Sequence, residues 1–140
     1  MFTKNFEEQL ISWKVLRDSL EEEVDPFRVL LDFYKKAPLT TISCDPWDRD
    51  TWAGPWELLS ENSYCRFSIV LGMCYSLQLT DRFKGSKFEI HICTDREKSE
   101  THYLLYVDNN VLNYNDEVVL REELPEALYS QRIYEMPTLQ

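Results

Sequence analysis

Glycine is scarce in this sequence, since only Gly54, Gly72 and Gly85 occur among its 140 residues. Loops that cradle phosphate groups need several glycines, because the backbone must approach the ligand closely and adopt positive φ angles. The shortage argues against a glycine-rich phosphate-binding loop. It also argues against a fold built from many tight glycine turns.

Histidine and cysteine are also few, and they are not spaced as metal ligands. The chain has two histidines and four cysteines, none of which form a Cys-x-x-Cys pair. That pair is the usual signature of a structural zinc site, so we expect no metal and no other cofactor. One alternative is His91 with Cys93. Residues two apart on a strand point the same way, and Cys44 or Glu89 could complete a metal site with them.

Long hydrophobic runs are absent as well. No apolar run reaches the roughly 18 residues that a membrane-spanning helix needs. Residues 1–10 lack the basic stretch and apolar run of a secretion signal. We therefore expect a protein of the cytoplasm, with no membrane partner and with its cysteines as thiols in a reducing compartment.

Positive charge is in deficit, with 15 basic against 25 acidic residues and a formal net charge of −10. Such a surface repels nucleic-acid phosphates and anionic membranes, so we expect no direct nucleic-acid binding. The acidity keeps the protein soluble or suits a basic protein partner. A nucleic-acid mimic that occupies a basic groove is a third alternative, although the acidic residues are spread along the chain.

Apolar and aromatic residues, in contrast, are plentiful. Hydrophobic residues make up 44% of the chain, which has four Trp, eight Tyr and seven Phe. This is enough for one core, so we expect a single domain over residues 1–140. Periodicity predicts helices over residues 5–22, 26–36, 55–60 and 63–79. The last is apolar on nearly every face, as a central helix is, and its Gly72 is expected to permit close approach of another element.

The second half of the chain carries strand patterns. Strands are predicted over residues 87–94, 102–107, 111–115 and 131–136, with a helical turn over 125–129. Asp108, Asn109 and Asn110 tolerate the positive φ of a tight turn and predict a hairpin. The sequence therefore predicts an α+β fold, in which N-terminal helices and a central buried helix pack on an antiparallel sheet of three to four strands.

Trp47, Trp52 and Trp56 lie within ten residues, in a segment interrupted by Asp-Pro and Gly-Pro pairs. Long loops need anchoring, which favours tryptophans that pack the loop against the body of the protein. An exposed group of tryptophans would instead mark a binding surface. These three residues are therefore also the candidate binding surface.

Cys65, His102 and Asn115 are the candidate catalytic residues. Cys65 is expected in the first turn of the central helix, where the helix dipole favours the reactive thiolate. With the hairpin as predicted, His102 pairs with Asn115, which then orients the imidazole. A shift of one residue in the turn brings Asn113 or Glu117 closer instead.

This order of elements resembles the core of transglutaminase-like and papain-like cysteine enzymes, over roughly residues 62–116. In that superfamily a nucleophilic Cys begins a buried helix, a His lies on a following strand, and an Asp or Asn lies on the next. The resemblance implies a cysteine hydrolase or acyl transferase. In it Cys65 attacks a carbonyl, His102 acts as the base and Asn115 holds the His tautomer. The residues before Cys65 and after His102 depart from the family pattern.

The segments PWDRDTWAGPWELLSENSYC, LQLTDRFKGSKFEIHI and VLNYND are similar to small uncharacterised proteins of tailed bacteriophages of marine cyanobacteria. The resemblance covers most of residues 26–119. It implies a phage protein made in the host cytoplasm, with a place in the virion or a role in acting on the host. The sequence thus favours a non-catalytic virion or assembly component, or an acidic binder of a host protein. Either would associate with itself or with a protein partner, and the cysteine hydrolase is the alternative.

Overall fold

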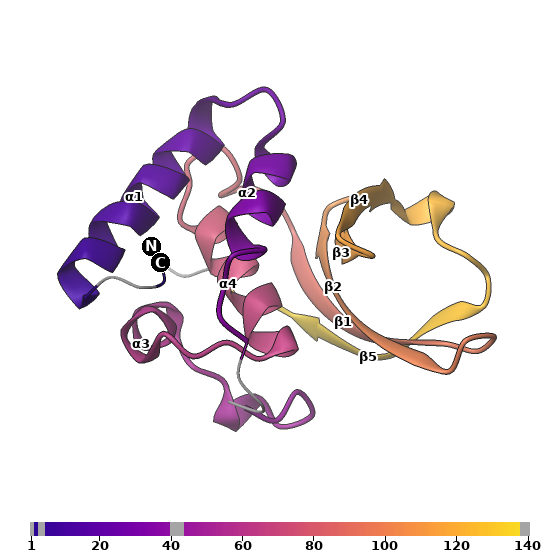
Figure 1. The fold of residues 1–140 in the computed structure, drawn as a ribbon. Helices are drawn as coiled ribbons and strands as arrows, with labels where there is room; N and C mark the ends of the chain where they lie inside the picture. The colour runs from indigo at the N-terminus through magenta and orange to yellow at the C-terminus, as the bar shows by residue number, and fades with distance from the viewer. Residues whose placement is uncertain (1, 3–4, 40–43, 138–140) are drawn as a thin grey trace.

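Helices and a curved sheet form two layers in the computed structural model, which describes residues 2, 5–39 and 44–137 (Figure 1). The helices are α1 (Phe6–Glu22), α2 (Pro26–Tyr34), α3 (Pro55–Glu61) and α4 (Arg66–Gln78), with short 3-10 helices η1 (Arg49–Thr51) and η2 (Arg121–Glu123). The strands are β1 (Phe88–Asp95), β2 (Glu100–Val107), β3 (Asn110–Tyr114), β4 (Glu117–Leu120) and β5 (Leu128–Glu135). The predicted α+β class is confirmed, and the sheet has five strands.

The strands lie in the order β4-β3-β2-β1-β5, and all neighbours are antiparallel. Strands β3 and β4 curl over one face of the sheet, and the chain then returns across that side to add β5 beside β1 (Figure 1). The helical turn expected over residues 125–129 is wrong. The helical turn forms earlier, as η2, where the Glu123 carboxylate accepts the Leu120 N–H at 2.8 Å. Residues 125–128 form a non-helical turn closed by the Leu128 N–H and the Pro125 carbonyl at 3.1 Å, and Leu128 already pairs with Asp95 in β5.

Side-chain caps begin the first two helices, close to the predicted starts. The side chain of Asn5 accepts the N–H of Glu8 at 2.9 Å, and that of Asp25 accepts the N–H of Arg28 at 3.2 Å. Pro26 occupies the first turn of α2, where the missing N–H costs nothing. These caps fix where α1 and α2 begin, and the two helices lie side by side against α4 (Figure 1).

Helix α4 is the centre of the core, covered by the other helices on one side and by the sheet on the other (Figure 1). A Cβ atom at Gly72 would lie 2.8 Å from the ring of Tyr34, so the expected close approach is confirmed, and α2 is the element that approaches. Ser76, one helical turn after Gly72, contacts both α1 and α2. Its hydroxyl accepts the Trp13 indole N–H at 2.9 Å and lies 3.2 Å from the Tyr34 hydroxyl.

No helix in the described part of the chain combines the length and the apolar composition that crossing a bilayer requires.

Candidate functional site

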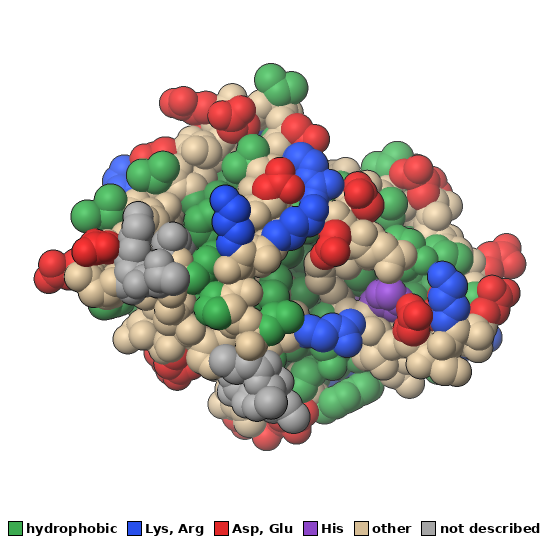
Figure 2. Space-filling view, in the orientation of Figure 1, with side chains coloured by type: hydrophobic (Ala, Val, Ile, Leu, Met, Phe, Trp, Pro, Cys, Tyr) green, Lys and Arg blue, Asp and Glu red, His purple; other side chains and the backbone are tan. Residues whose placement is uncertain are grey.

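A groove of about 670 Å³ lies between the helices and the curled sheet. This volume falls within the roughly 300–1,000 Å³ that ligand sites occupy. The space-filling view shows the hollow at the centre of this face, with basic side chains at its edge (Figure 2). The groove is therefore the first candidate for a binding site.

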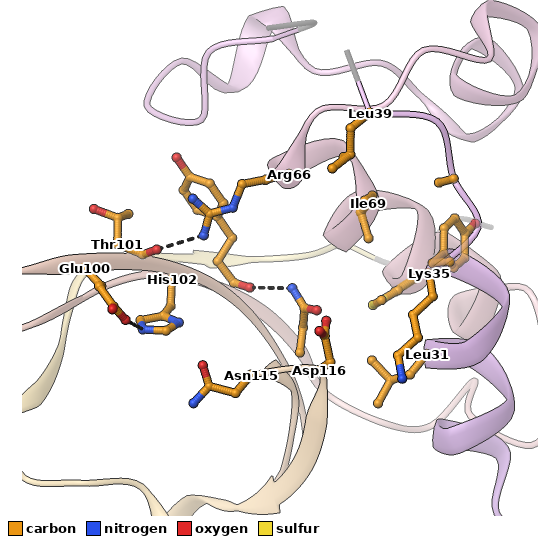
Figure 3. A pocket seen from close by; sticks show the side chains of 15 residues that line it. Leu31, Lys35, Leu39, Arg66, Ile69, Glu100, Thr101, His102, Asn115 and Asp116 are labelled. Carbon is orange, nitrogen blue, oxygen red and sulfur yellow. Dashed lines mark hydrogen bonds and ion pairs between the residues drawn. The ribbon is translucent and has the colours of Figure 1, made fainter. Parts of the chain in front are cut away.

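The two walls of the groove differ in chemistry. The helix side is mainly apolar and is lined by Leu31, Tyr34, Ala37, Leu39, Ile69 and Met73. The sheet side is mainly polar and is lined by Glu100, Thr101, His102, Tyr103, Asn113, Asn115 and Asp116. Lys35 and Arg66 reach toward the space from α2 and from the start of α4 (Figure 3). A ligand here would place an apolar group on the helices and polar groups on the sheet.

A bulge in β3 shapes the polar wall. The ladder between β2 and β3 has the predicted register but ends at the pair Leu105 and Leu112. Asn113 then adopts a φ of 75°, and its side-chain amide donates to a β2 carbonyl at 3.2 Å. Because the bulge interrupts the ladder, the expected pair of His102 with Asn115 does not form. Both side chains nevertheless line the groove.

Cys65 lies apart from these two residues. Helix α4 begins at Arg66, so Cys65 is its N-cap and not a residue of its first turn, which corrects the expected position. Its buried Sγ lies 3.1 Å from the Ser68 hydroxyl and 4.0 Å from the Sγ of Cys44. Within the described residues no hydrogen bond joins Cys65 to His102, and Cys65 does not line the groove.

The surroundings of His102 are consistent with a ligand-contacting residue. Its Nε2 lies 3.5 Å from a carboxylate oxygen of Glu100, and its ring packs 5.4 Å from that of Tyr114. The adjacent Thr101 carbonyl accepts a hydrogen bond from Arg66 at 3.0 Å, which ties the start of α4 to β2 (Figure 3). Two of the three predicted catalytic residues thus share the groove, and the third contacts other partners.

The three tryptophans do not form one surface cluster. Trp52 packs at 4.8 Å and 4.7 Å on the rings of Phe67 and Tyr134, so it anchors the loop as the packing hypothesis predicts. Trp56 packs edge-on against Trp13 of α1 at 5.2 Å. Trp47 and Trp56 are 51% and 52% exposed, and no ring contact joins any two of the three within the described residues.

A second polar cluster lies on the face of the sheet turned away from α4. His91 is 96% buried, and its Nδ1 lies 2.7 Å from the hydroxyl of Ser130, an exposed residue of β5. Its Nε2 lies 3.2 Å from Glu89, whose carboxylate also accepts from Arg121 at 3.0 Å. The Tyr106 ring stacks on the imidazole at 3.6 Å. We call these five residues the His91 cluster.

Burial and charge set the protonation of this cluster. Desolvation lowers the pKa of His91 below its ordinary value and outweighs the opposing effect of Glu89. Desolvation raises the pKa of Glu89, but hydrogen bonds from His91 and Arg121 outweigh it and leave that pKa below its usual range. Near neutral pH the cluster therefore holds a neutral imidazole beside a carboxylate. Because the carboxylate accepts the Nε2 proton, Nδ1 is left to accept the Ser130 hydroxyl.

The alternative metal site predicted from the sequence would use His91 with Cys93, and either Cys44 or the carboxylate of this cluster. Cys93 lies beside the cluster, with its Sγ 3.5 Å from the Ser130 hydroxyl, whereas Cys44 lies next to Cys65. No group of three or more His, Cys, Asp or Glu side chains in the described ranges is arranged to hold a metal ion.

The lowered pKa of His91 predicts acid sensitivity. In the unfolded chain the imidazole protonates near pH 6.5, while in the folded protein it stays neutral to lower pH. The stabilising contribution is therefore complete above pH 6.5 and is lost as pH falls toward the folded-state pKa. We expect His91→Gln to flatten the decline of the unfolding free energy between about pH 7 and 5. Urea unfolding across this range measures the unfolding free energy of both proteins. An equal decline with pH in the wild type and in His91→Gln would contradict the prediction.

Neither the family models nor the curated proteins that were searched give a match to this chain. Function is therefore inferred from the groove and from the His91 cluster. Sequence reasoning identified His102 and Asn115 but missed Lys35, Arg66 and Ser130. Lys35 falls near the end of the helix predicted over residues 26–36, and Ser130 lies one residue before the predicted last strand.

Proposed function

We propose that this chain is a binding protein whose groove takes a segment of a protein partner, and that Cys65, His102 and Asn115 do not act as a catalytic triad. The observation that carries this proposal is the groove itself, which has an apolar wall facing a polar one. Such a site fits a peptide that has an apolar anchor flanked by polar groups.

Charge points to a basic partner segment. The chain carries a net charge of −10, which attracts and steers a basic partner over distances longer than a contact. Within the groove, Arg66 is engaged by the Thr101 carbonyl and the Tyr103 ring, and Lys35 lies 3.8 Å from Asp32. The cations of the groove are thus already partnered, and Glu100 and Asp116 face the space. We infer a segment that combines an aliphatic or aromatic residue with Arg or Lys.

One exposed leucine inside the groove and one exposed valine outside it provide a matched test of peptide binding. Leu39 lines the groove and is 62% exposed, whereas Val24 lies in the turn between α1 and α2 and is 97% exposed. Peptides are selected on the wild-type protein from a display library, and their affinities are measured by calorimetry for Leu39→Arg and Val24→Arg. We expect Leu39→Arg to weaken binding by about tenfold or more, as loss of one apolar contact and a like charge would, and Val24→Arg to leave it unchanged.

A second prediction concerns the salt dependence and the sequences of the selected peptides. Because electrostatic steering is screened by salt, their binding should weaken as salt rises, and their sequences should be rich in Arg or Lys beside an apolar residue. Peptides that are acidic, or that bind both variants equally, would overturn the proposal. Loss of binding on Trp47→Ala alone would instead place the site at the loop.

Phage origin remains part of the proposal and is supported only by the resemblance of three sequence segments. A virion or assembly component would be retained in purified particles, whereas a binder of a host protein would stay in the soluble lysate. The same groove would serve either role, with a virion protein or a host protein as its partner.

A further inference from the structure

We propose that Ser130 is a nucleophile that accepts acyl groups from small carboxylic esters, with His91 as its general base and Glu89 as a positioning residue. This activity is separate from the groove and goes beyond the proposed binding function. It stands on the geometry of the His91 cluster, in which a hydroxyl, an imidazole and a carboxylate follow one another at 2.7 Å and 3.2 Å. These are the separations and the order that an activated serine requires.

The base is held in the productive orientation. His91 and Glu89 lie two residues apart on β1 and point to the same face, where the Tyr106 ring covers one side of the imidazole at an angle of 12°. Arg121 donates to the Glu89 carboxylate at 3.0 Å, and Lys87 lies 3.5 Å from it. The carboxylate therefore remains charged, fixes the Nε2–H tautomer and directs Nδ1 at the Ser130 hydroxyl.

The nucleophile is accessible, although its base is buried. Ser130 is exposed and belongs to β5, which is an edge strand of the sheet. The Ala127 carbonyl accepts from Arg96 of the adjoining turn, so it faces the β1 side. Because the direction of backbone groups alternates along an antiparallel strand, the N–H of Ser130 faces the free edge. That N–H is placed to donate to the oxygen of a substrate attacked by its own side chain.

One exposed apolar side chain lies on the same face of the sheet as this hydroxyl. Ile133 pairs with His91, is 51% exposed and shares its face of the sheet. It also borders an open hollow of about 430 Å³ between β5 and the loop that carries Trp47. Ile133 is the apolar contact that this face offers to a short aliphatic acyl group, since the hollow itself is lined mostly by charged residues. Neither this hollow nor the groove includes Ser130 in its lining, so no enclosing wall among the described residues selects a large substrate and we infer a small ester.

The chemistry balances without an added cofactor. The Oγ of Ser130 attacks the ester carbonyl carbon while its proton passes to Nδ1 of His91. The bond from that carbon to the alcohol oxygen then breaks, and the leaving alcohol takes the proton. Water attacks the acyl–Ser130 ester in the same way, which releases the carboxylic acid and restores the hydroxyl.

A fluorophosphonate probe tests the nucleophile directly. The Oγ of an activated serine displaces fluoride from phosphorus and leaves a stable phosphonyl ester, which peptide mass spectrometry locates. We expect labelling at Ser130, none in Ser130→Ala, and unchanged labelling in Ser60→Ala, which alters an exposed serine of α3. With His91→Gln the labelling rate should fall by about 100-fold or more, the usual contribution of a general base. Hydrolysis of p-nitrophenyl acetate should follow the same order.

The variant Glu89→Gln distinguishes a role of Glu89 in positioning the His91 base from a role in folding alone. Removing the carboxylate takes away the group that stabilises the imidazolium, so the acid limb of the pH–rate profile for Ser130 labelling should move to lower pH. A purely structural role would change stability without moving this profile. The proposal is overturned if folded wild-type protein leaves Ser130 unlabelled by excess probe, or if Ser130 is labelled at equal rates with and without His91.

Discussion

Gly72→Ala is expected to lower the free energy of unfolding by about 1–3 kcal/mol, the usual cost of adding a methyl group to a filled core. The new Cβ would lie 2.8 Å from two atoms of Tyr34 and 2.9 Å from a third. That ring cannot easily move, because Tyr34 is buried and its hydroxyl lies within hydrogen-bonding distance of Ser76. Alanine favours a helix over glycine by roughly 1 kcal/mol, so the clash must exceed that gain.

Gly85→Ala is the matched control. Nothing lies within 4 Å of a Cβ at this position, and its φ is not positive, so the substitution should leave stability unchanged or raise it slightly. Both variants are compared by urea unfolding. Tyr34→Leu should remove most of the penalty from Gly72→Ala in a double-mutant cycle. Equal stability of the two alanine variants would contradict the close packing of α2 on α4.

Mild peroxide treatment is expected to join Cys44 to Cys65. Their Sγ atoms lie 4.0 Å apart, and although all four cysteines are buried, Cys44 and Cys65 keep 8% and 7% exposure against 0% and 1% for Cys74 and Cys93. Peroxide oxidises one thiol to a sulfenic acid, the other thiol displaces water from it, and the disulfide forms. Closing this loop should raise the unfolding free energy by up to about 3 kcal/mol, less any strain in the folded state.

Peptide mapping without reductant measures this result. The expected product lacks two hydrogen atoms and links the peptides that carry Cys44 and Cys65. Cys65→Ser should abolish the cross-link, whereas Cys74→Ala should not affect it. A product in which Cys74 or Cys93 is cross-linked would contradict the prediction, as would oxidation of Cys65 with Cys44 unchanged.

Local patterns were sufficient to predict most of the fold. The starts of α1 and α2, the apolar helix around Gly72 and the hairpin after Val107 all depend on residues close in sequence. Strand β4 was missed because its four residues give too short a pattern to distinguish from a loop. The late turn was misplaced because the pairing of Leu128 with Asp95 depends on a distant strand.

The candidate site was harder to predict, because it depends on contacts between distant segments. The Asn113 bulge is invisible to an alternation pattern, so the partner expected for His102 was wrong. The alternation of β1 did place Glu89 and His91 on one face. However, only the pairing of β5 with β1 brings Ser130 to the imidazole, 39 positions along the chain. A pattern within one strand contains no information about its neighbour.

The position of β5 has a consequence for folding. Strands β1 to β4 pair with their sequence neighbours, so this part of the sheet can form as soon as residues 88–120 are available. Strand β1 must then keep one side open until residues 128–135 arrive. During synthesis the unpaired edge of β1 is exposed for this interval, and an open edge can pair with another chain. The folding step most sensitive to crowding by other copies is therefore the last one, in which β5 closes the sheet.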